Sequence, residues 1–510
     1  MSCGLNIRPG GPRRKGPIPA LHTGMRILIT GGTGLIGQAA AKALRTRGHT
    51  VRLLSRHADE EEPEAGIEYW PASVTDADAL AGAAAGCDVV LHVAGIVAET
   101  PPELTFENVN INGTRNIVRE ADINGVRRFV YVSSYGADRG TSEYHQSKRA
   151  AERIAGEFPR DVVITRPGNV YGPGDEVISA LVKLVRALPV VPIIDDGDQE
   201  FQPVWHEDMG EALAGIIEDP APGAAPINLV GPETVTLNRL LDIMGEITGN
   251  EPRRVPLPSG IAGLAARFAA TIGVDIPLKP DVLQMLLDDQ SLQPGQVNAL
   301  DKYVQRPTHV TTGMRQLLES MPAQELEDGY GKPVHRQFVA RIQEPLYGAE
   351  ELFRMFCADY DSFLPVERAD QQGNPRQCIE GETIVLALPL RGDIAVRVEE
   401  ATNNAVTLVT VDGHPLAGFV RFTWEPADNG LAFQINVYDR PATLLDTIGM
   451  ALGGSVAQRS TWTAAVERMI EASRGRAPEG VQHETKPMSD EEMKSVQEWL
   501  DQLRASRTAG

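Results

Sequence analysis

Tyr144 and Lys148 are the residue pair with the clearest chemical potential in this chain. They stand four positions apart in a segment whose apolar residues have helical spacing, so both side chains fall on one face of a helix. A free phenol has a pKa of about 10 and is a poor base at neutral pH. A lysine cation one turn away would stabilise the phenolate and lower the pKa of Tyr144. The pair could then move a proton to or from a substrate oxygen.

Ser134 is the third residue of this predicted catalytic group. It follows a strand pattern, Phe129–Ser133, and precedes the helix of Tyr144. A hydroxyl in this place could hold the substrate oxygen while Tyr144 exchanges the proton. A tyrosine and a lysine four positions apart occur by chance in many chains, so the prediction depends on the elements that precede them.

A glycine-rich segment lies between the first strand pattern and the first helix pattern. Its glycines satisfy both G-x-G-x-x-G and G-x-x-G-x-x-G, and glycine lets the backbone turn tightly and approach a pyrophosphate. The helix N-terminus then offers N–H groups and a partial positive charge to the phosphates. The positive charge of an oxidised nicotinamide would also favour the Tyr144 phenolate. The predicted dinucleotide contacts are Gly31, Gly32, Thr33, Gly34, Leu35, Ile36 and Gly37.

The end of the second strand indicates which dinucleotide binds. An acidic residue there would bind the ribose 2′-hydroxyl of NAD, but this strand ends at Ser55 and Arg56, with no acid before Asp59. Arg56 therefore favours the 2′-phosphate of NADP(H), and NAD(H) stays possible. In the alternative interpretation, Arg56 is an exposed side chain that touches only the adenine face.

Short apolar strands alternate with helix patterns from Met25 to about residue 230. Strands that are apolar on both sides and separated by helices indicate a parallel sheet covered on both faces. The predicted fold class is therefore α/β, a Rossmann-type doubly wound sheet. The predicted strands are Ile27–Thr30, Thr50–Ser55, Val89–Val93, Phe129–Ser133 and Val162–Arg166.

Residues 25–325 resemble the short-chain dehydrogenase/reductase superfamily in its extended or atypical branch, which is NAD-dependent epimerase/dehydratase-like. The matching segments are Thr30–Gly37, His92–Gly95, Asn110–Thr114, Val132–Ser134, Tyr144–Lys148, Arg166–Gly174 and Gln202–Asp208. The resemblance implies that Asn110 supports the active-site helix and that Lys148 also binds the cofactor ribose. It further implies cofactor contacts from Ser73, Val74, Ala94, Gly95, Pro167, Gly168 and Asn169. The stretch Ala72–Asp76 departs from the Gly-Asp that the family usually has before the adenine contact.

Within the superfamily, the chain is most similar to the group of the nucleotide-binding accessory subunit of respiratory complex I. Ser134 and Tyr144 are only ten positions apart, and Asp281–Asp289 is also similar. This resemblance implies that the bound nucleotide serves either a structural or a catalytic purpose. The intact Tyr144–Lys148 pair favours catalysis.

The 510 residues exceed what one hydrophobic core supports, so at least two domains are expected. Residues 1–24 read as a disordered extension, with Met25 as the true or an alternative start. Residues 25–325 form the nucleotide-binding domain, with the substrate part mainly at 167–325. Residues 326–475 show five strands with two-residue alternation and a long helix, an α+β domain of helix-grip type. Residues 476–510 read as a linker and an amphipathic helix that starts with a capping box at Ser489.

Residues 330–475 resemble, more weakly, a family of uncharacterised bacterial and plant domains. Fusion of such a domain to a dehydrogenase suggests that this part binds an apolar molecule or a protein partner. The partner expected at the first domain is a small-molecule substrate, and an apolar one is among the options.

Composition excludes several function classes. The net charge of −21 disfavours nucleic acid and anionic membrane surfaces. Four scattered cysteines without C-x-x-C spacing argue against a disulfide scaffold, a zinc site or a redox pair, and indicate a cytoplasmic protein. No metal site is predicted, because the adjacent His206, Glu207 and Asp208 cannot all face one ion. No membrane-spanning segment is apparent; Ile261–Val274 could lie on a membrane surface, but packing on its own domain is favoured.

Three functions remain open from the sequence. The first is an NAD(P)-dependent oxidoreductase that acts on a carbonyl or alcohol through Ser134, Tyr144 and Lys148, with epimerase or dehydratase chemistry as a variant. The second is a non-catalytic NADP(H)-binding assembly or sensor protein. The third makes the C-terminal domain a binder of apolar ligands that presents them to the first domain.

Overall fold

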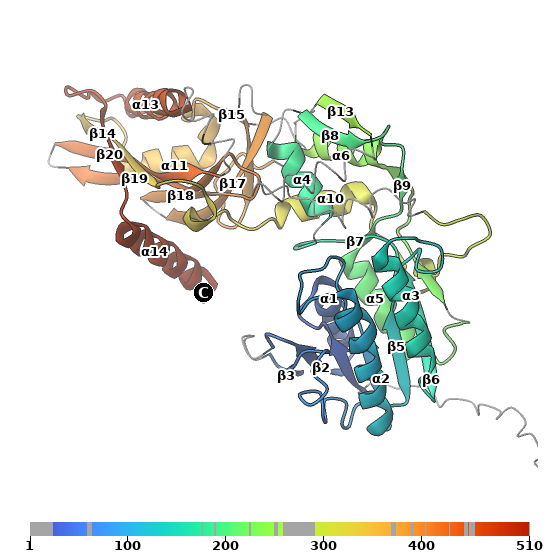
Figure 1. The fold of residues 1–510 in the computed structure, drawn as a ribbon. Helices are drawn as coiled ribbons and strands as arrows, with labels where there is room; N and C mark the ends of the chain where they lie inside the picture. The colour runs from blue at the N-terminus through green and yellow to red at the C-terminus, as the bar shows by residue number, and fades with distance from the viewer. Residues whose placement is uncertain are drawn as a thin grey trace, which may run out of the picture. The chain divides into compact units, whose positions relative to one another are not determined.

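A computed structural model describes most of the chain as two compact units (Figure 1). Unit 1 comprises Met1–Val170, Gln202–Pro232 and Gln290–Thr308, and unit 2 comprises Tyr171–Phe201, Glu233–Asp289 and His309–Gly510. The described residues are 24–58, 64–175, 177–187, 190–223, 226–248, 253–258, 291–368, 374–388, 392–402, 404–427, 429–442, 447 and 454–508.

Several predictions from the sequence fall outside these described residues. They are the extension over residues 1–23, the segment Ile261–Val274 and the stretch Asp281–Asp289. The predicted domain boundaries at residues 325 and 475 stay predictions. Among the described residues, every helix is too short or too polar to cross a bilayer.

Unit 1 contains a seven-stranded sheet in the order β11-β6-β5-β4-β1-β2-β3, in which every neighbouring pair is parallel. This confirms the predicted doubly wound fold. All five predicted strands are present, while β3 and β11 were not predicted because neither is a continuous apolar run. The strands are β1 Arg26–Thr30, β2 Thr50–Ser55, β3 Ile67–Pro71, β4 Val89–His92, β5 Arg128–Val132, β6 Asp161–Pro167 and β11 Ile227–Leu229.

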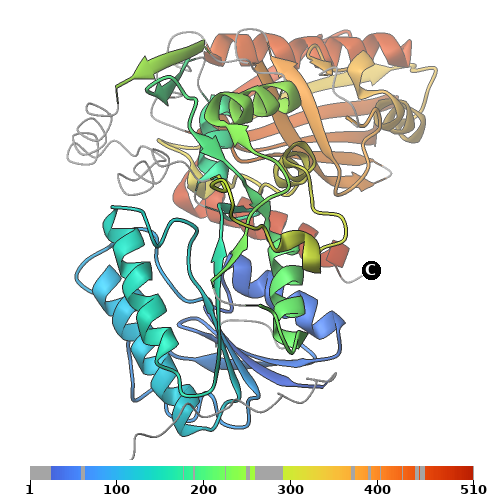
Figure 2. The same cartoon turned by 90° about the vertical axis from the view of Figure 1, so that its right-hand side faces the viewer.

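Two helical layers cover this sheet because successive side chains of each strand point to opposite faces. Ile27 and Ile29 of β1 pack with α1 and α5, whereas Leu28 packs in the core that contains α2 and α3. Figure 2 shows the teal and cyan helices on one side of the sheet and the blue and green helices on the other. The elements of these layers and their connections are α1 Leu35–Thr46, η1 Glu107–Asn112, α2 Gly113–Ile123, α3 Glu143–Gly156, α5 His206–Glu218 and α9 Leu300–Tyr303; the two-residue strands are β7 Val170–Tyr171 and β10 Val204–Trp205.

Unit 2 contains an eight-stranded antiparallel sheet in the order β15-β16-β17-β18-β19-β20-β14-β21. The predicted α+β class of this region is confirmed, and a turn at Asp412-Gly413 joins β18 to β19, with Gly413 at a φ of 91°. The strands are β14 Val334–Gln343, β15 Glu367–Arg368, β16 Thr383–Leu388, β17 Gly392–Thr402, β18 Ala405–Thr410, β19 Leu416–Ala427, β20 Gly430–Pro441 and β21 Gln482–Pro487.

Three of these strands, β14, the two-residue β15 and β21, were not predicted, and β14 and β21 were missed for different reasons. In β14, Arg336 occupies an inward position between apolar residues and is buried against Asp439, which hides the two-residue alternation. β21 lies within the predicted linker, and all of its side chains are exposed, so its sequence carries no apolar signal. It is held by backbone pairing to β14.

Helices cover both faces of the antiparallel sheet. α11 (Ala349–Ala358) and α13 (Ser455–Ser473) pack on the face that carries Phe422 and Trp424, and α14 (Asp490–Thr508) packs on the face that carries Phe419. The predicted capping box is confirmed at the start of α14. The Ser489 N–H donates to Glu492 at 2.7 Å, and the Glu492 N–H donates to the Ser489 hydroxyl at 3.2 Å.

The remaining part of unit 2 is a smaller mixed region. It contains the helices α6 and α10, which bury their apolar faces. The elements are α4 Ile178–Ala187, β8 Val190–Ile194, β9 Glu200–Phe201, β12 Val235–Thr236, α6 Leu237–Thr248, β13 Arg253–Leu257, α10 Val310–Glu319, η2 Leu326–Asp328 and η3 Tyr360–Ser362.

Candidate nucleotide and catalytic site

The glycine loop joins β1 to α1 in a conformation that only glycine fits. Gly31 has a φ of 67°, and a Cβ on it would lie 2.9 Å from the Ala94 nitrogen. A Cβ on Gly37 would lie 2.2 Å from the Gly31 carbonyl oxygen, and one on Gly32 would lie 2.8 Å from the Leu53 Cβ. The loop is therefore packed against its own backbone and β2, with the N-terminus of α1 directly after it, as the phosphate-site prediction requires.

The ends of the neighbouring strands carry the other predicted cofactor residues. Ser55 closes β2, and its buried hydroxyl has no hydrogen-bond partner within the described part of the chain. Arg56 follows it and is exposed. Ala94 and Gly95 follow β4, and the Ala94 N–H donates to the Thr30 hydroxyl at 3.2 Å. These residues lie at the carboxyl ends of β1, β2 and β4, where open α/β sheets bind their ligands.

Hydrogen bonds to backbone carbonyls hold the segments that were predicted to contact the adenine and the nicotinamide. Ser73 and Val74 follow β3, and the Asn116 amide donates to the Val74 carbonyl at 3.0 Å. Gly168 donates its N–H to the Leu229 carbonyl at 2.9 Å. In the next residue, the Oδ1 atom of Asn169 is buried and has no hydrogen-bond partner among the residues that the structure describes.

Tyr144, Ser134 and Lys148 come together as predicted. Ser134 follows β5, and its hydroxyl donates to the Tyr135 carbonyl at 3.3 Å. The hydroxyl also lies within hydrogen-bonding reach of the Tyr144 phenol in the first turn of α3. Lys148, one turn further along α3, is buried. Its ammonium group donates to the Val132 carbonyl at 2.8 Å and lies 4.8 Å from the centre of the Tyr131 ring.

The prediction that Lys148 lowers the pKa of Tyr144 is wrong for this arrangement. Burial raises the pKa of the phenol, and the Ser134 hydrogen bond opposes that shift only in part. The ammonium group of Lys148 is directed to the Val132 carbonyl instead. Burial also lowers the pKa of Lys148 to about 8, against the opposing effect of Glu152.

Asn110 holds the catalytic helix and the loop after β4, as the resemblance implied. Its amide donates to the Ser147 hydroxyl at 2.9 Å and to the Ile96 carbonyl at 3.1 Å, and its Oδ1 accepts the Ile96 N–H at 2.9 Å. Ser147 is the residue before Lys148. Asn110 therefore acts as a positioning residue for Lys148.

His92 is a positioning residue whose part in the site the sequence did not reveal. The Thr114 hydroxyl donates to the Asn110 carbonyl at 2.6 Å, so its oxygen accepts from His92 Nε2 at 3.0 Å. His92 Nδ1 then accepts from the Thr30 hydroxyl at 2.6 Å. Burial, with a smaller effect of the Lys148 cation, lowers the pKa of His92 to about 3, so the ring is neutral. In the sequence, the available signal for this role was a single histidine at the end of an apolar strand.

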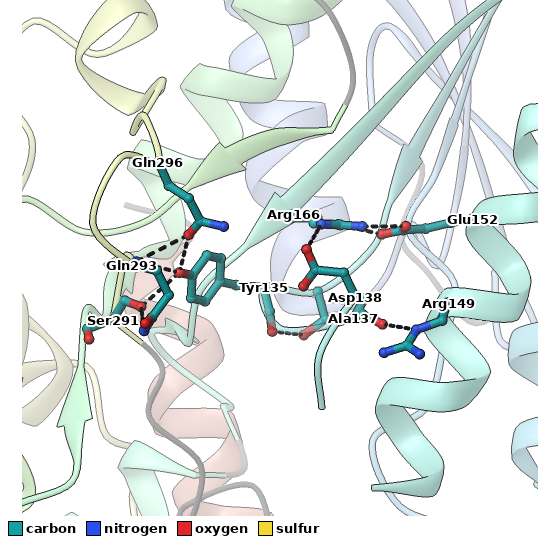
Figure 3. A network of polar contacts seen from close by, with 10 residues as sticks. Tyr135, Ala137, Asp138, Arg149, Glu152, Arg166, Ser291, Gln293 and Gln296 are labelled. Atoms are coloured by element: carbon teal, nitrogen blue, oxygen red, sulfur yellow. Dashed lines mark hydrogen bonds and ion pairs between the residues drawn. The ribbon is translucent and has the colours of Figure 1, made fainter. Parts of the chain in front are cut away.

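A polar network fixes the loop that carries Ser134 (Figure 3). The guanidinium of Arg166 makes two 2.8 Å hydrogen bonds to Glu152 on α3 and a 2.7 Å bond to Asp138 in the loop. The Tyr135 hydroxyl donates to the Gln296 side-chain oxygen at 2.6 Å, and the Gln293 N–H donates to Tyr135 at 3.0 Å. The loop after β5 is therefore held from two sides, which restricts the position of Ser134.

The cluster His206, Glu207 and Asp208 does not converge on one point. Glu207 pairs with Lys42 at 2.7 Å, and Asp208 accepts the Thr308 N–H at 2.6 Å. Over the described ranges, no group of three or more His, Cys, Asp or Glu side chains is arranged to hold a metal ion.

Comparisons with known proteins identify the family of this chain. Residues 27–230 match the model of the NAD dependent epimerase/dehydratase family. The ceramide reductase of Caulobacter vibrioides is 30% identical over 236 residues, which are 46% of this chain and 73% of that protein. NADH dehydrogenase [ubiquinone] 1 alpha subcomplex subunit 9 of Arabidopsis thaliana mitochondria is 26% identical over 254 residues, 47% of this chain and 62% of the relative. The crystal structure of gox2253 matches with 25% identity and a TM-score of 0.46, over 58% of this chain and 97% of that chain. The chain belongs to the NAD-dependent epimerase/dehydratase family, within the extended short-chain dehydrogenase/reductase superfamily.

Proposed function

We propose that this protein is an NAD(P)-dependent oxidoreductase that acts on a carbonyl or alcohol carbon of a small molecule. The supporting observation is that Ser134 lies within hydrogen-bonding reach of Tyr144 beside the buried Lys148, at the carboxyl edge of the sheet that also carries the glycine loop. The test is oxidation of NADPH or NADH when the protein is mixed with a small-molecule extract of its source cells. Oxidation that requires the protein supports the proposal. Bound nucleotide without oxidation would favour the assembly or sensor function.

The residues present fit a nicotinamide dinucleotide. Gly31 and Gly37 leave a cradle that a Cβ would fill, and the N-terminus of α1 suits the phosphates. The buried, unpartnered oxygens of Ser55 and Asn169 suit the ribose and the nicotinamide amide. When bound, this group would supply or accept a hydride.

The protein's own residues would handle the proton. Because burial raises the pKa of Tyr144, the phenol is protonated at neutral pH and suits a general acid that donates to the oxygen of a carbonyl substrate. Ser134 would donate a second hydrogen bond to that oxygen. Lys148, whose ammonium group donates to the Val132 carbonyl, would bind the cofactor ribose. Carbonyl reduction uses this protonated form of the phenol, whereas alcohol oxidation would use the phenolate.

The titration of Lys148 tests whether the reaction requires its charged ammonium form. Its pKa of about 8 means that the ammonium form dominates below pH 8 and the neutral amine above it. If the charge is required, kcat/KM falls above pH 8, by about tenfold per pH unit. The measurement is a pH profile of nicotinamide oxidation. The variant Lys148→Met should be slower and should lack this limb, and a wild-type profile that stays flat through pH 10 would contradict the role.

Arg56 is proposed to select NADP(H). Replacing it with glutamate puts a negative charge beside the 2′-phosphate and should weaken NADPH binding by about 10–100-fold, with NADH binding little changed. Nucleotide fluorescence titrations measure both affinities. Arg153→Glu, the same change at an exposed arginine of α3, is the matched control and should leave both affinities unchanged. Equal losses for both nucleotides in Arg56→Glu would contradict the NADP(H) preference.

The relatives support two further statements about the substrate. The likeness to a ceramide reductase supports an apolar carbonyl compound as the substrate. The family description supports epimerase or dehydratase chemistry as the alternative reaction. An epimerase would return the hydride to its substrate, so its nucleotide would show no net oxidation. A protein partner of residues 330–510 stays a prediction.

A further inference from the structure

Cys357 and Cys378 lie side by side in unit 2, although they are 21 positions apart in the sequence. Cys357 lies near the end of α11, and Cys378 lies in the segment before β16. The Cys378 N–H donates to the Cys357 carbonyl at 2.9 Å. Cysteine spacing alone gave no sign of this pair.

The backbone contact places the pair within reach of a disulfide. With an N–Cα bond of about 1.5 Å and an O···Cα span of about 2.4 Å, a 2.9 Å hydrogen bond keeps the two α-carbons within about 6.8 Å. Disulfides usually need an α-carbon separation of about 4.4–6.8 Å. A second contact fixes the same segment, because the Tyr360 hydroxyl donates to the Pro375 carbonyl at 2.7 Å.

The two thiols differ in exposure and acidity. Cys357 is partly exposed, whereas Cys378 is buried in the apolar core of the antiparallel sheet. The nearness of the two thiols lowers the pKa of Cys357 and, with burial, raises the pKa of Cys378. An accessible sulfur with thiolate character next to a shielded thiol is the arrangement of an attacking and a resolving cysteine.

We propose that Cys357 and Cys378 form a reversible oxidation site that hydrogen peroxide converts to a disulfide. The Cys357 thiolate attacks one peroxide oxygen, the O–O bond breaks, and Cys357 becomes a sulfenic acid as hydroxide leaves. The Cys378 sulfur then attacks the Cys357 sulfur, the S–O bond breaks, and water leaves. In total, two thiols and one peroxide give one disulfide and two waters. A dithiol such as dithiothreitol reverses the step by exchange.

The test uses the full-length protein, reduced and then treated with hydrogen peroxide. Free thiols are blocked, the chain is cut with trypsin without reduction, and the peptides are identified by mass spectrometry. The expected product joins Met355–Arg368 to Gln377–Arg391 and disappears with dithiothreitol. Recovery of both peptides unlinked, as blocked thiols or as sulfinic acids, overturns the proposal. This readout is independent of nucleotide chemistry.

Three variants distinguish the roles of the cysteines. In Cys378→Ser, a sulfenic-acid reagent such as dimedone should label position 357, and in Cys357→Ser it should leave Cys378 unlabelled. Cys87→Ser is the control, because Cys87 is buried in unit 1 and burial raises its pKa; it should leave the linked peptide unchanged. Circular dichroism checks that each variant folds, and the wild-type peptide decides the result if one does not. The disulfide-linked form should also raise the melting temperature of unit 2 by about 5–10 °C, because the bond closes the loop between Cys357 and Cys378.

Discussion

Replacing Tyr144 with phenylalanine is expected to slow nicotinamide oxidation by about 10²–10⁴-fold, which is about 3–5 kcal/mol in the barrier. The variant removes only the hydroxyl that lies within hydrogen-bonding reach of Ser134, and the aromatic ring that faces Phe106 stays in place. Nucleotide affinity should therefore stay within about twofold of the original protein, because the glycine loop is untouched. Assays of NADPH oxidation with cell extract measure the rate of the reaction, and fluorescence titration with NADPH measures the nucleotide affinity.

Tyr303→Phe is the matched control for this prediction. It also removes a tyrosine hydroxyl from unit 1, one that hydrogen-bonds Asp219 at 3.1 Å outside the candidate site. Its rate should equal that of the original protein. If Tyr144→Phe and Tyr303→Phe oxidise NADPH equally fast, Tyr144 is not the proton donor.

Replacing Gly37 with alanine is expected to weaken nucleotide binding by about 100-fold, or about 2.8 kcal/mol. The new Cβ would lie 2.2 Å from the Gly31 carbonyl oxygen and 2.8 Å from the Gly32 Cα. These are backbone atoms that cannot rotate away, so the phosphate loop must shift as a whole. Calorimetric titration with NADPH measures the loss.

Gly156→Ala provides the comparison for that experiment. Gly156 ends α3, and a Cβ added there would meet nothing within 4 Å. Nucleotide affinity should be unchanged in this variant, and both variants should keep the far-ultraviolet spectrum of the folded protein. Unchanged affinity in Gly37→Ala would mean that the loop does not bind the phosphates.

The nucleotide half of the fold could be predicted because its signals are local. Strands buried on both faces read as apolar runs, and the glycines of the phosphate loop are required by a backbone conformation that Gly31 adopts at a φ of 67°. Tyr144 and Lys148 share a helix, so their spacing alone brings them to one face. Asn110 could be assigned only through the family resemblance, because its partners Ile96 and Ser147 are distant in the sequence.

The features that could not be predicted depend on tertiary contacts. The pKa of Tyr144 follows from its burial, which no spacing rule reports, and the Val132 carbonyl that holds Lys148 belongs to a different element. β14 was hidden by Arg336, whose inward position makes sense only beside Asp439. The contact between Cys357 and Cys378 likewise appears only when α11 packs beside the segment before β16.

The most direct measurement of the central proposal follows deuterium from the nicotinamide C4 position of labelled NADPH. The protein is incubated with the labelled nucleotide and a small-molecule extract of its source cells, and the extract is compared by mass spectrometry before and after. The proposed oxidoreductase transfers the label to one or more products, and Tyr144→Phe reduces that transfer by about 10²–10⁴-fold. Tight NADPH binding with no deuterium in any product, under conditions where the nucleotide is stable, would contradict the account.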